Sequence, residues 1–146
     1  MRINLILFGF CVIFAQQVLA DDKEEALKEI YEAVDMCKEK VKASDAEIEL
    51  LKQRKEPASH EGKCLHACLM KHFKVMDGNN KFSKSVALDH AKHFMNDDAD
   101  KMKKAEQIAT ACENIDVPAD ECEASDMYIK CFLGESKKLN VENLFA

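Results

Sequence analysis

The chain has 146 residues, a length that suits one domain with one hydrophobic core. Its 4 glycines and 2 prolines are too few for the many tight turns of a β-sandwich or barrel, and strong helix formers dominate the composition. Because 27 acidic residues outnumber 21 basic ones, the net charge of -6 argues against nucleic acid as a partner.

Residues 1–20 have the pattern of a secretory signal peptide. Arg2 supplies a positive charge, an apolar run from Ile3 to Ala15 follows, and Val18 and Ala20 precede the expected cut after position 20. This run is too short to span a bilayer, which argues against the alternative of an N-terminal anchor helix. We therefore expect a secreted, extracellular protein without stable membrane insertion, whose mature domain comprises residues 21–146.

Apolar periodicity and capping signals predict six helices and an all-α fold. Ser44 and Glu47 have capping-box spacing at the start of the second helix, and Pro57 lies beyond its end. The expected helices cover approximately residues 21–43, 44–55, 61–76, 83–95, 100–113 and 120–133.

Six cysteines remain after removal of the signal peptide, and an even number in an oxidising compartment predicts three disulfides. Cys64, Cys68 and His72 share one face of the third helix, but Cys64 and His72 lie about 12 Å apart along its axis. Zinc ligands lie only ~2.0–2.3 Å from the ion, so these three residues cannot converge on a metal. Cys64 and Cys68 also lie too far apart to pair, since i,i+4 Cβ atoms are ~5–6 Å apart. We therefore expect no metal site and no cofactor, and a third helix that is cross-linked to two other segments.

The spacing of the six cysteines resembles that of the six-cysteine insect odorant-binding proteins, the pheromone-binding and general odorant-binding superfamily. Successive gaps are 26, 3, 43, 9 and 8 residues, and the gaps of 3 and 8 are the most specific to the family. The resemblance covers the whole mature chain. It implies the pairs Cys37–Cys68, Cys64–Cys122 and Cys112–Cys131.

The same resemblance implies a compact bundle of about six helices, stapled by the three disulfides around an apolar cavity. Such a protein binds small hydrophobic molecules, such as odorants, pheromones, other semiochemicals or lipids, and carries them through aqueous fluid. A chemosensory receptor is a further candidate partner, and the expected state is a monomer or a weak homodimer. By position, the cavity wall would be formed by Ile30, Val34, His66, Met70, Phe73, Phe94, Ile108, Ala109, Tyr128 and Phe132.

Each of these side chains also has a simpler interpretation. An apolar residue in a small bundle is first of all a core residue. The Tyr128 hydroxyl could orient an alcohol, aldehyde or ester, but it could equally bond to the protein itself. His66 could release the ligand when it gains a proton at mildly acidic pH, or it could remain a neutral polar residue of the wall.

The C-terminal segment, approximately residues 134–146, is expected to act as a lid. Val141, Leu144 and Phe145 are spaced i, i+3 and i+4, so a helical turn would present them on one face. Left in water they would form an apolar patch, so this face either docks on the bundle or recruits a partner. The resemblance to the odorant-binding proteins implies docking over the cavity mouth, with Phe145 as the plug. The alternative is a disordered end.

Other functions find less support in the sequence. The five histidines invite a search for a catalytic triad, but no Gly-x-Ser-x-Gly motif, no His-Glu-x-x-His motif and no unpaired cysteine accompanies them. His90 and His93 are spaced as neighbours on a solvated helix face. We therefore expect no enzyme. The alternative function is that of a secreted salivary, venom or reproductive protein that acts through protein–protein interaction.

Overall fold

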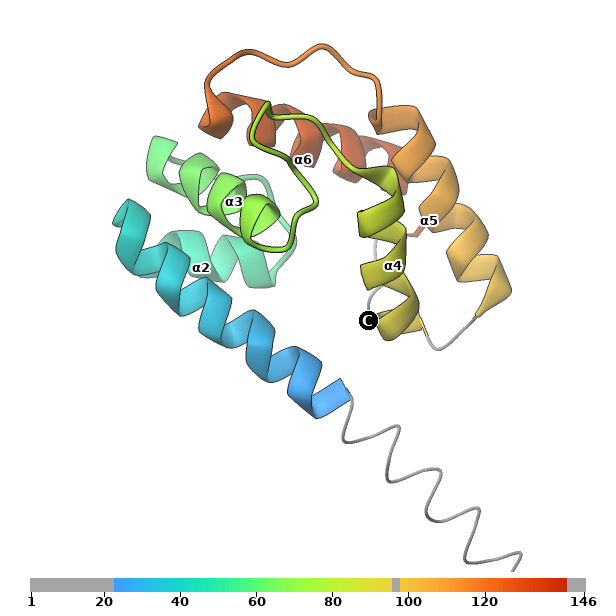
Figure 1. Ribbon diagram of the computed structural model, residues 1–146, viewed down its shortest axis with the longest axis horizontal. Helices are drawn as coiled ribbons and strands as arrows, with labels where there is room; N and C mark the ends of the chain where they lie inside the picture. Colours follow the sequence, from blue (N-terminus) through green and yellow to red (C-terminus); the bar gives the residue numbers. More distant parts are fainter. Residues whose placement is uncertain (1–22, 96–97, 142–146) are drawn as a thin grey trace, which may run out of the picture. The chain divides into compact units, whose positions relative to one another are not determined.

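The computed structural model describes residues 23–95 and 98–141, which are helical apart from turns, loops and one isolated bridge between Met76 and Phe82. Residues 23–41 form the first described helix, and five labelled helices follow it (Figure 1). These are α2 (Asp45–Lys52), α3 (His60–His72), α4 (Lys84–Met95), α5 (Ala99–Cys112) and α6 (Glu121–Lys138). The all-α class with six helices is confirmed, while the predicted signal peptide lies outside the described residues.

The chain divides into two compact units, Met1–Glu32 and Ala33–Ala146. In the first unit the described residues 23–32 are helical, with Ile30 half-buried and Tyr31 61% exposed. The second unit holds all the labelled helices. None of the helices in the described part of the chain has the length and apolarity needed to cross a membrane.

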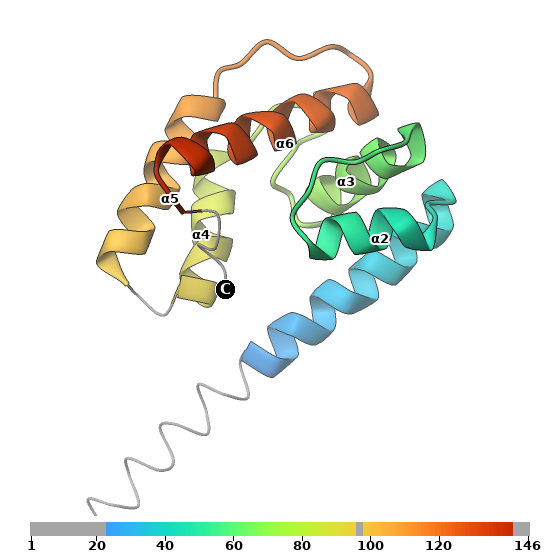
Figure 2. The ribbon, with the colours of Figure 1, turned by 180° about the vertical axis from the view of Figure 1, so that it is seen from behind.

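Within the second unit, α6 runs from α3 to α5. It packs against α3 and against α5, and α5 packs in turn against α4, as both views show (Figures 1 and 2). Disulfides reinforce these contacts: Cys64–Cys122 joins α3 to α6, and Cys112–Cys131 joins α5 to α6. The third, Cys37–Cys68, joins α3 to the helix of residues 23–41. All three pairs agree with the pairing that the resemblance implies, and α3 is indeed cross-linked to two segments.

Several helices begin at a polar residue that caps them, as predicted for Ser44. The Ser44 hydroxyl accepts a hydrogen bond from the Glu47 N–H at 3.3 Å, and the Asp120 carboxylate accepts one from the Glu123 N–H at 2.9 Å. The capping box at α2 is only half formed. The Glu47 side chain is buried and accepts the Ala58 N–H at 3.1 and 3.3 Å instead.

Four helices end without glycine at the position that adopts left-handed backbone geometry. This position is held by Lys42, Arg54, Lys74 and Asn140, with φ of 59, 56, 59 and 52°. After α3, the Val75 N–H donates to the Met70 carbonyl at 2.8 Å, a Schellman ending. Consequently α3 ends at His72, four residues before the predicted end at Met76. The last helix instead runs through Gly134 to Lys138, so residues 134–138 of the predicted lid belong to α6.

Candidate functional site

Besides a cluster of Cys37, Ala43 and Leu65, the buried apolar side chains of α3 to α6 and of the neighbouring segments form two clusters. The Tyr128 cluster consists of Ala67, Met70, Met76, Phe82, Ala109, Ala124 and Tyr128. The Val141 cluster consists of Ala91, Met95, Ala105, Ile108 and Val141. Leu88 of α4 and Phe132 of α6 pack against both clusters, so the apolar interior is continuous through these two side chains.

Six of the residues predicted to line a cavity lie in these clusters or against them: Met70, Ala109 and Tyr128 in the first, Ile108 and Val141 in the second, and Phe132 against both. The Phe132 ring lies 5.2 Å from the ring of Phe82 and 6.3 Å from that of Tyr128, measured between centroids. Segments that are far apart in the sequence thus meet around one aromatic side chain. Whether these residues contact a ligand stays a prediction.

The Tyr128 hydroxyl is bonded to the protein itself. It donates to the Asn80 carbonyl at 3.0 Å and accepts the Phe82 N–H at 3.2 Å. Burial raises the pKa of this hydroxyl, and the hydrogen bond from Phe82, which lowers the pKa, has the smaller effect. Tyr128 therefore ties α6 to the turn before α4, and its only proton is already donated.

His66 is buried, with 8% of its surface exposed. Burial lowers the pKa of its imidazole, while the charges of Glu47 on α2 and Asp126 on α6 raise it to a smaller extent. The neutral form is therefore favoured in the folded protein, in the presence of two buried carboxyl groups that would attract a proton.

The structure adds Asp126, which the sequence did not single out. Its side chain is buried, and Oδ2 contacts the Lys130 Nζ at 2.7 Å and the Lys63 Nζ at 3.6 Å. Among the described residues, Oδ1 has no hydrogen-bond partner. The i,i+4 spacing of Asp126 and Lys130 was a visible signal of an ion pair, but it did not show that the pair lies against the interior.

Four of the other predicted wall residues are only partly covered. Phe73 caps the C-terminus of α3 and is half-buried, and Val34 and Phe94 are half-buried as well. Ile30, in the first unit, is also half-buried. Partial burial is compatible with a wall and with a core edge, so these four remain candidates.

His90 is not on a solvated face, contrary to the prediction. Its ring is half-buried, its Nε2 donates to the Phe73 carbonyl at 2.9 Å, and its centroid lies 5.7 Å from the Phe73 ring. This hydrogen bond gives a partner to a carbonyl group at the end of α3, where no partner is available within the helix, and it explains why the His90 ring is half-buried. His93 is exposed as predicted.

The end of the described chain is docked on the bundle. The Val141 N–H donates to the Ser136 carbonyl at 3.0 Å in a Schellman ending, and the side chain packs with Ala91, Met95 and Ile108. Leu139 packs against the same cluster. Leu144 and Phe145, the remaining residues of the predicted lid face, lie outside the described residues.

The cysteines on the face of α3 are both engaged. Cys64 and Cys68 form disulfides to different partners, and a disulfide sulfur is not a thiolate ligand. The two cysteines of this face thus serve cross-linking in the oxidised protein, and His72 contacts the ring of Phe73 instead.

Known proteins are similar to this chain in sequence and in fold. The model of the PBP/GOBP family matches residues 19–135. General odorant-binding protein 28a of Drosophila melanogaster is 36% identical over 134 residues, covering 92% of this chain and 94% of that protein. The solved structure of odorant-binding protein dmelOBP28a from Drosophila melanogaster has a TM-score of 0.73 at 35% identity, covering 82% of this chain and 98% of that chain.

A more distant structure shares the fold alone. The fatty acid binding protein OBP56a from the oral disk of the blowfly Phormia regina has a TM-score of 0.61 at 20% identity, covering 79% of this chain and 95% of that chain. The family consists of odorant-binding carriers and is not known for enzymes, in agreement with the prediction that the chain is no enzyme. With most of its length matched by the family model and by a relative above 30% identity, the chain belongs to the PBP/GOBP family of odorant-binding proteins.

Proposed function

We propose that the chain is a secreted carrier that binds a small hydrophobic molecule between the Tyr128 and Val141 clusters and transports it through extracellular fluid. The observation that carries this proposal is the position of Phe132, which packs against both clusters. Because this ring lies between two apolar clusters, a hydrocarbon ligand inserted beside it would contact apolar side chains of both. Family membership supports the same function.

The apolar character of this region sets the scale of affinity. A hydrocarbon chain that buries ~300 Å² gains about 7.5 kcal/mol at ~25 cal/mol per Å², before the cost of ordering the ligand. Dissociation constants near the micromolar range are therefore expected. Since the hydroxyl of Tyr128 is engaged by the 80–82 turn, we expect ligand length and shape to matter more than a polar end group.

Variants at Phe132 test the site directly. In a series of straight-chain alcohols, Phe132→Ala should shift the preferred ligand to a longer chain, because it opens space between the clusters. Phe132→Trp should shift it to a shorter chain, because it fills that space. Displacement of a fluorescent hydrophobic probe measures both shifts.

Met127→Ala is the matched control, because Met127 lies on the same helix and is 40% exposed. It should leave the chain-length preference unchanged. An identical preference in the wild type and in both Phe132 variants would rule out this site.

The alternative, a salivary, venom or reproductive protein that acts through protein–protein interaction, makes a different prediction. It would be favoured if the folded protein bound none of a broad panel of hydrophobic probes. The carrier proposal includes a chemosensory receptor as partner. It also includes a monomeric or weakly dimeric state, which sedimentation with and without ligand measures.

A further inference from the structure

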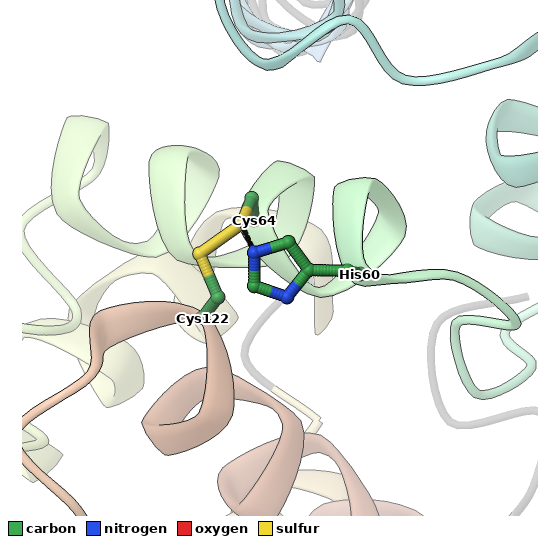
Figure 3. A group of neighbouring side chains, drawn as sticks. All are labelled: His60, Cys64 and Cys122. Carbon is green, nitrogen blue, oxygen red and sulfur yellow. Dashed lines mark hydrogen bonds between the residues drawn. A yellow bond between two sulfur atoms is a disulfide. The ribbon is translucent and has the colours of Figure 1, made fainter.

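A histidine lies directly beside one of the three disulfides. His60 and Cys64 are one helical turn apart on α3, and Cys122 comes from the first turn of α6 (Figure 3). The His60 Nε2 is 3.5 Å from the Cys64 Sγ, and the possible ligand atoms of all three residues lie within 4.8 Å of one another. Two helices thus bring one imidazole nitrogen and two sulfurs together.

These three atoms are the ligands that zinc prefers once the sulfurs are thiolates. The ligand atoms around a tetrahedral zinc ion lie about 3.5–3.8 Å from one another, given bonds of ~2.0–2.3 Å to the ion. The present spacing requires only small side-chain movements to reach that geometry. We propose that reduction of the Cys64–Cys122 disulfide creates a zinc site formed by His60, Cys64 and Cys122.

The zinc site would form in two steps, reduction of the disulfide and binding of the ion. A dithiol reductant delivers two electrons and two protons to the disulfide, which becomes two cysteine thiols while the reductant becomes a disulfide. Zn²⁺ then binds the two sulfurs and the neutral imidazole of His60, and the two thiol protons pass to water. The fourth coordination position is left for water, since three protein ligands are named.

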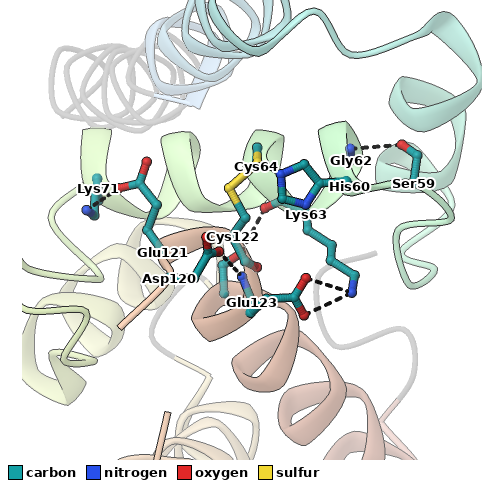
Figure 4. The surroundings of a disulfide bond; sticks show 11 residues. Ser59, His60, Gly62, Lys63, Cys64, Lys71, Asp120, Glu121, Cys122 and Glu123 are labelled. Carbon is teal, nitrogen blue, oxygen red and sulfur yellow. Dashed lines mark hydrogen bonds and ion pairs between the residues drawn. A yellow bond between two sulfur atoms is a disulfide. The ribbon is translucent and has the colours of Figure 1, made fainter. Parts of the chain in front are cut away.

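The structure contains contacts that would keep α3 and α6 together after the S–S bond is broken. The Lys63 Nζ contacts both carboxylate oxygens of Glu123 at 3.0 and 3.2 Å, and Lys71 pairs with Glu121 on the other side of the disulfide (Figure 4). The Ser125 hydroxyl also donates to the Lys63 carbonyl at 2.8 Å. Each contact is weak alone, but they flank the cysteines and hold the backbones in register.

The site is also accessible. His60 is exposed and Cys64 is half-buried, whereas Cys122 is buried with 7% of its surface exposed. A metal ion can therefore arrive from solvent on the His60 side and reach the buried sulfur last. The bound ion would replace the covalent cross-link between α3 and α6 with a coordinate one, so these two helices would stay joined after the Cys64–Cys122 disulfide is reduced.

Cobalt titration of the reduced full-length mature protein tests this proposal. The protein is reduced with a phosphine, excess reagent is removed, and Co²⁺ is added while thiolate charge-transfer bands and tetrahedral d–d bands are recorded. His60→Ala should weaken Co²⁺ binding roughly ten-fold or more. The matched variant His93→Ala, which changes an exposed histidine of α4, should bind as the wild type does.

A second pair of variants avoids reduction and keeps the other two disulfides. Cys122→His replaces one sulfur ligand by a nitrogen and leaves Cys64 as a free thiol, while Cys122→Ala leaves only two ligands. Zinc should raise the thermal midpoint of Cys122→His and leave that of Cys122→Ala unchanged. The proposal is overturned if neither the reduced protein nor Cys122→His binds the metal, or if binding by the reduced protein is the same in His60→Ala.

Discussion

The carboxylate of Glu47 lies where a side chain at position 62 would otherwise stand. A Cβ placed on Gly62 would come within 2.0 Å of the Glu47 Oε2, far inside any real contact distance. The carboxylate is held in place by the Ala58 N–H at 3.1 Å. The loop between α2 and α3 and the start of α3 thus depend on a glycine and a buried glutamate together.

Gly62→Ala should therefore destabilise the protein by about 1–3 kcal/mol, because it forces Glu47 away from its hydrogen bond and leaves the Ala58 N–H without it. Gly134→Ala is the matched control, since in the described part of the chain no atom beyond the surrounding helix backbone lies within 4 Å of a Cβ placed at this position in α6. That change should stabilise the protein by about 0.5–1 kcal/mol through helix propensity. Urea unfolding of both variants measures the difference, and equal effects of the two changes would contradict the role of Glu47.

Tyr128→Phe separates a structural role of the hydroxyl from a role in ligand binding. The change leaves the Asn80 carbonyl and the Phe82 N–H unpaired in a buried environment, at an expected cost of about 1–3 kcal/mol. Ligand affinity for alcohols and for alkanes of equal length should stay in the same ratio as in the wild type. A selective loss of affinity for alcohols would show that the hydroxyl orients the ligand after all.

Stability should decrease in mild acid because of His66. Burial lowers its pKa from 6.5, so below that pH the unfolded chain takes up a proton that the folded protein resists. This contribution to the unfolding free energy is fully present above about pH 6.5 and is lost as pH falls towards the lowered pKa of the folded state. Glu47 and Asp126, whose charges raise the pKa, reduce the effect without reversing it.

The same titration offers a route to ligand release, because a charged imidazole at the edge of the apolar interior would favour opening. Probe affinity and urea stability, measured at neutral and mildly acidic pH, should depend less on pH in His66→Phe than in the wild type. His93→Phe, at an exposed position, should behave as the wild type does. An unchanged pH dependence in His66→Phe would remove His66 from the mechanism.

Deletion of residues 139–146 should weaken probe binding several-fold by raising the dissociation rate. Val141 and Leu139 pack on the Val141 cluster, and their loss uncovers Ile108 and Met95. The helical circular dichroism should persist, because the three disulfides join residues that all precede the deletion. Stopped-flow displacement measures the rate.

A shorter deletion, of residues 142–146, keeps Val141 and removes Leu144 and Phe145. If it releases the probe as fast as the longer deletion, the lid action belongs to the last residues. If both truncated proteins release the probe as slowly as the full-length chain, the C-terminal segment does not act as a lid.

The sequence by itself determined the helical class, the framework of cross-links and the approximate helix positions. Periodic apolar residues and polar caps such as Ser44 and Asp120 act locally, so their effects can be read from neighbouring positions. The spacing of the six cysteines can likewise be read directly from the sequence. The resemblance drawn from that spacing led to the correct pairing, and the composition excluded a β fold.

Helix ends were predicted less well, because the chain ends its helices without the usual glycine. Lys74 and Asn140 take the left-handed conformation, and α6 continues through Gly134 beyond its expected end at residue 133. A lysine in that conformation is stabilised by the hydrogen bonds and packing that follow it, such as the bond from Val75 to Met70. No local sequence pattern predicts a helix end of this kind.

The tertiary structure alone decided what each buried polar group bonds to. Tyr128 reaches a turn more than 40 residues away, Glu47 turns from its own helix to Ala58, and His60 stands beside a disulfide whose second sulfur comes from α6. Such partners are brought together by the packing of distant segments, and a buried donor or acceptor takes whichever partner that packing presents. For this reason the sequence could name Tyr128, His66 and Phe132 as candidates, while only the fold distinguished a hydroxyl already used by the protein from an aromatic ring shared by two clusters.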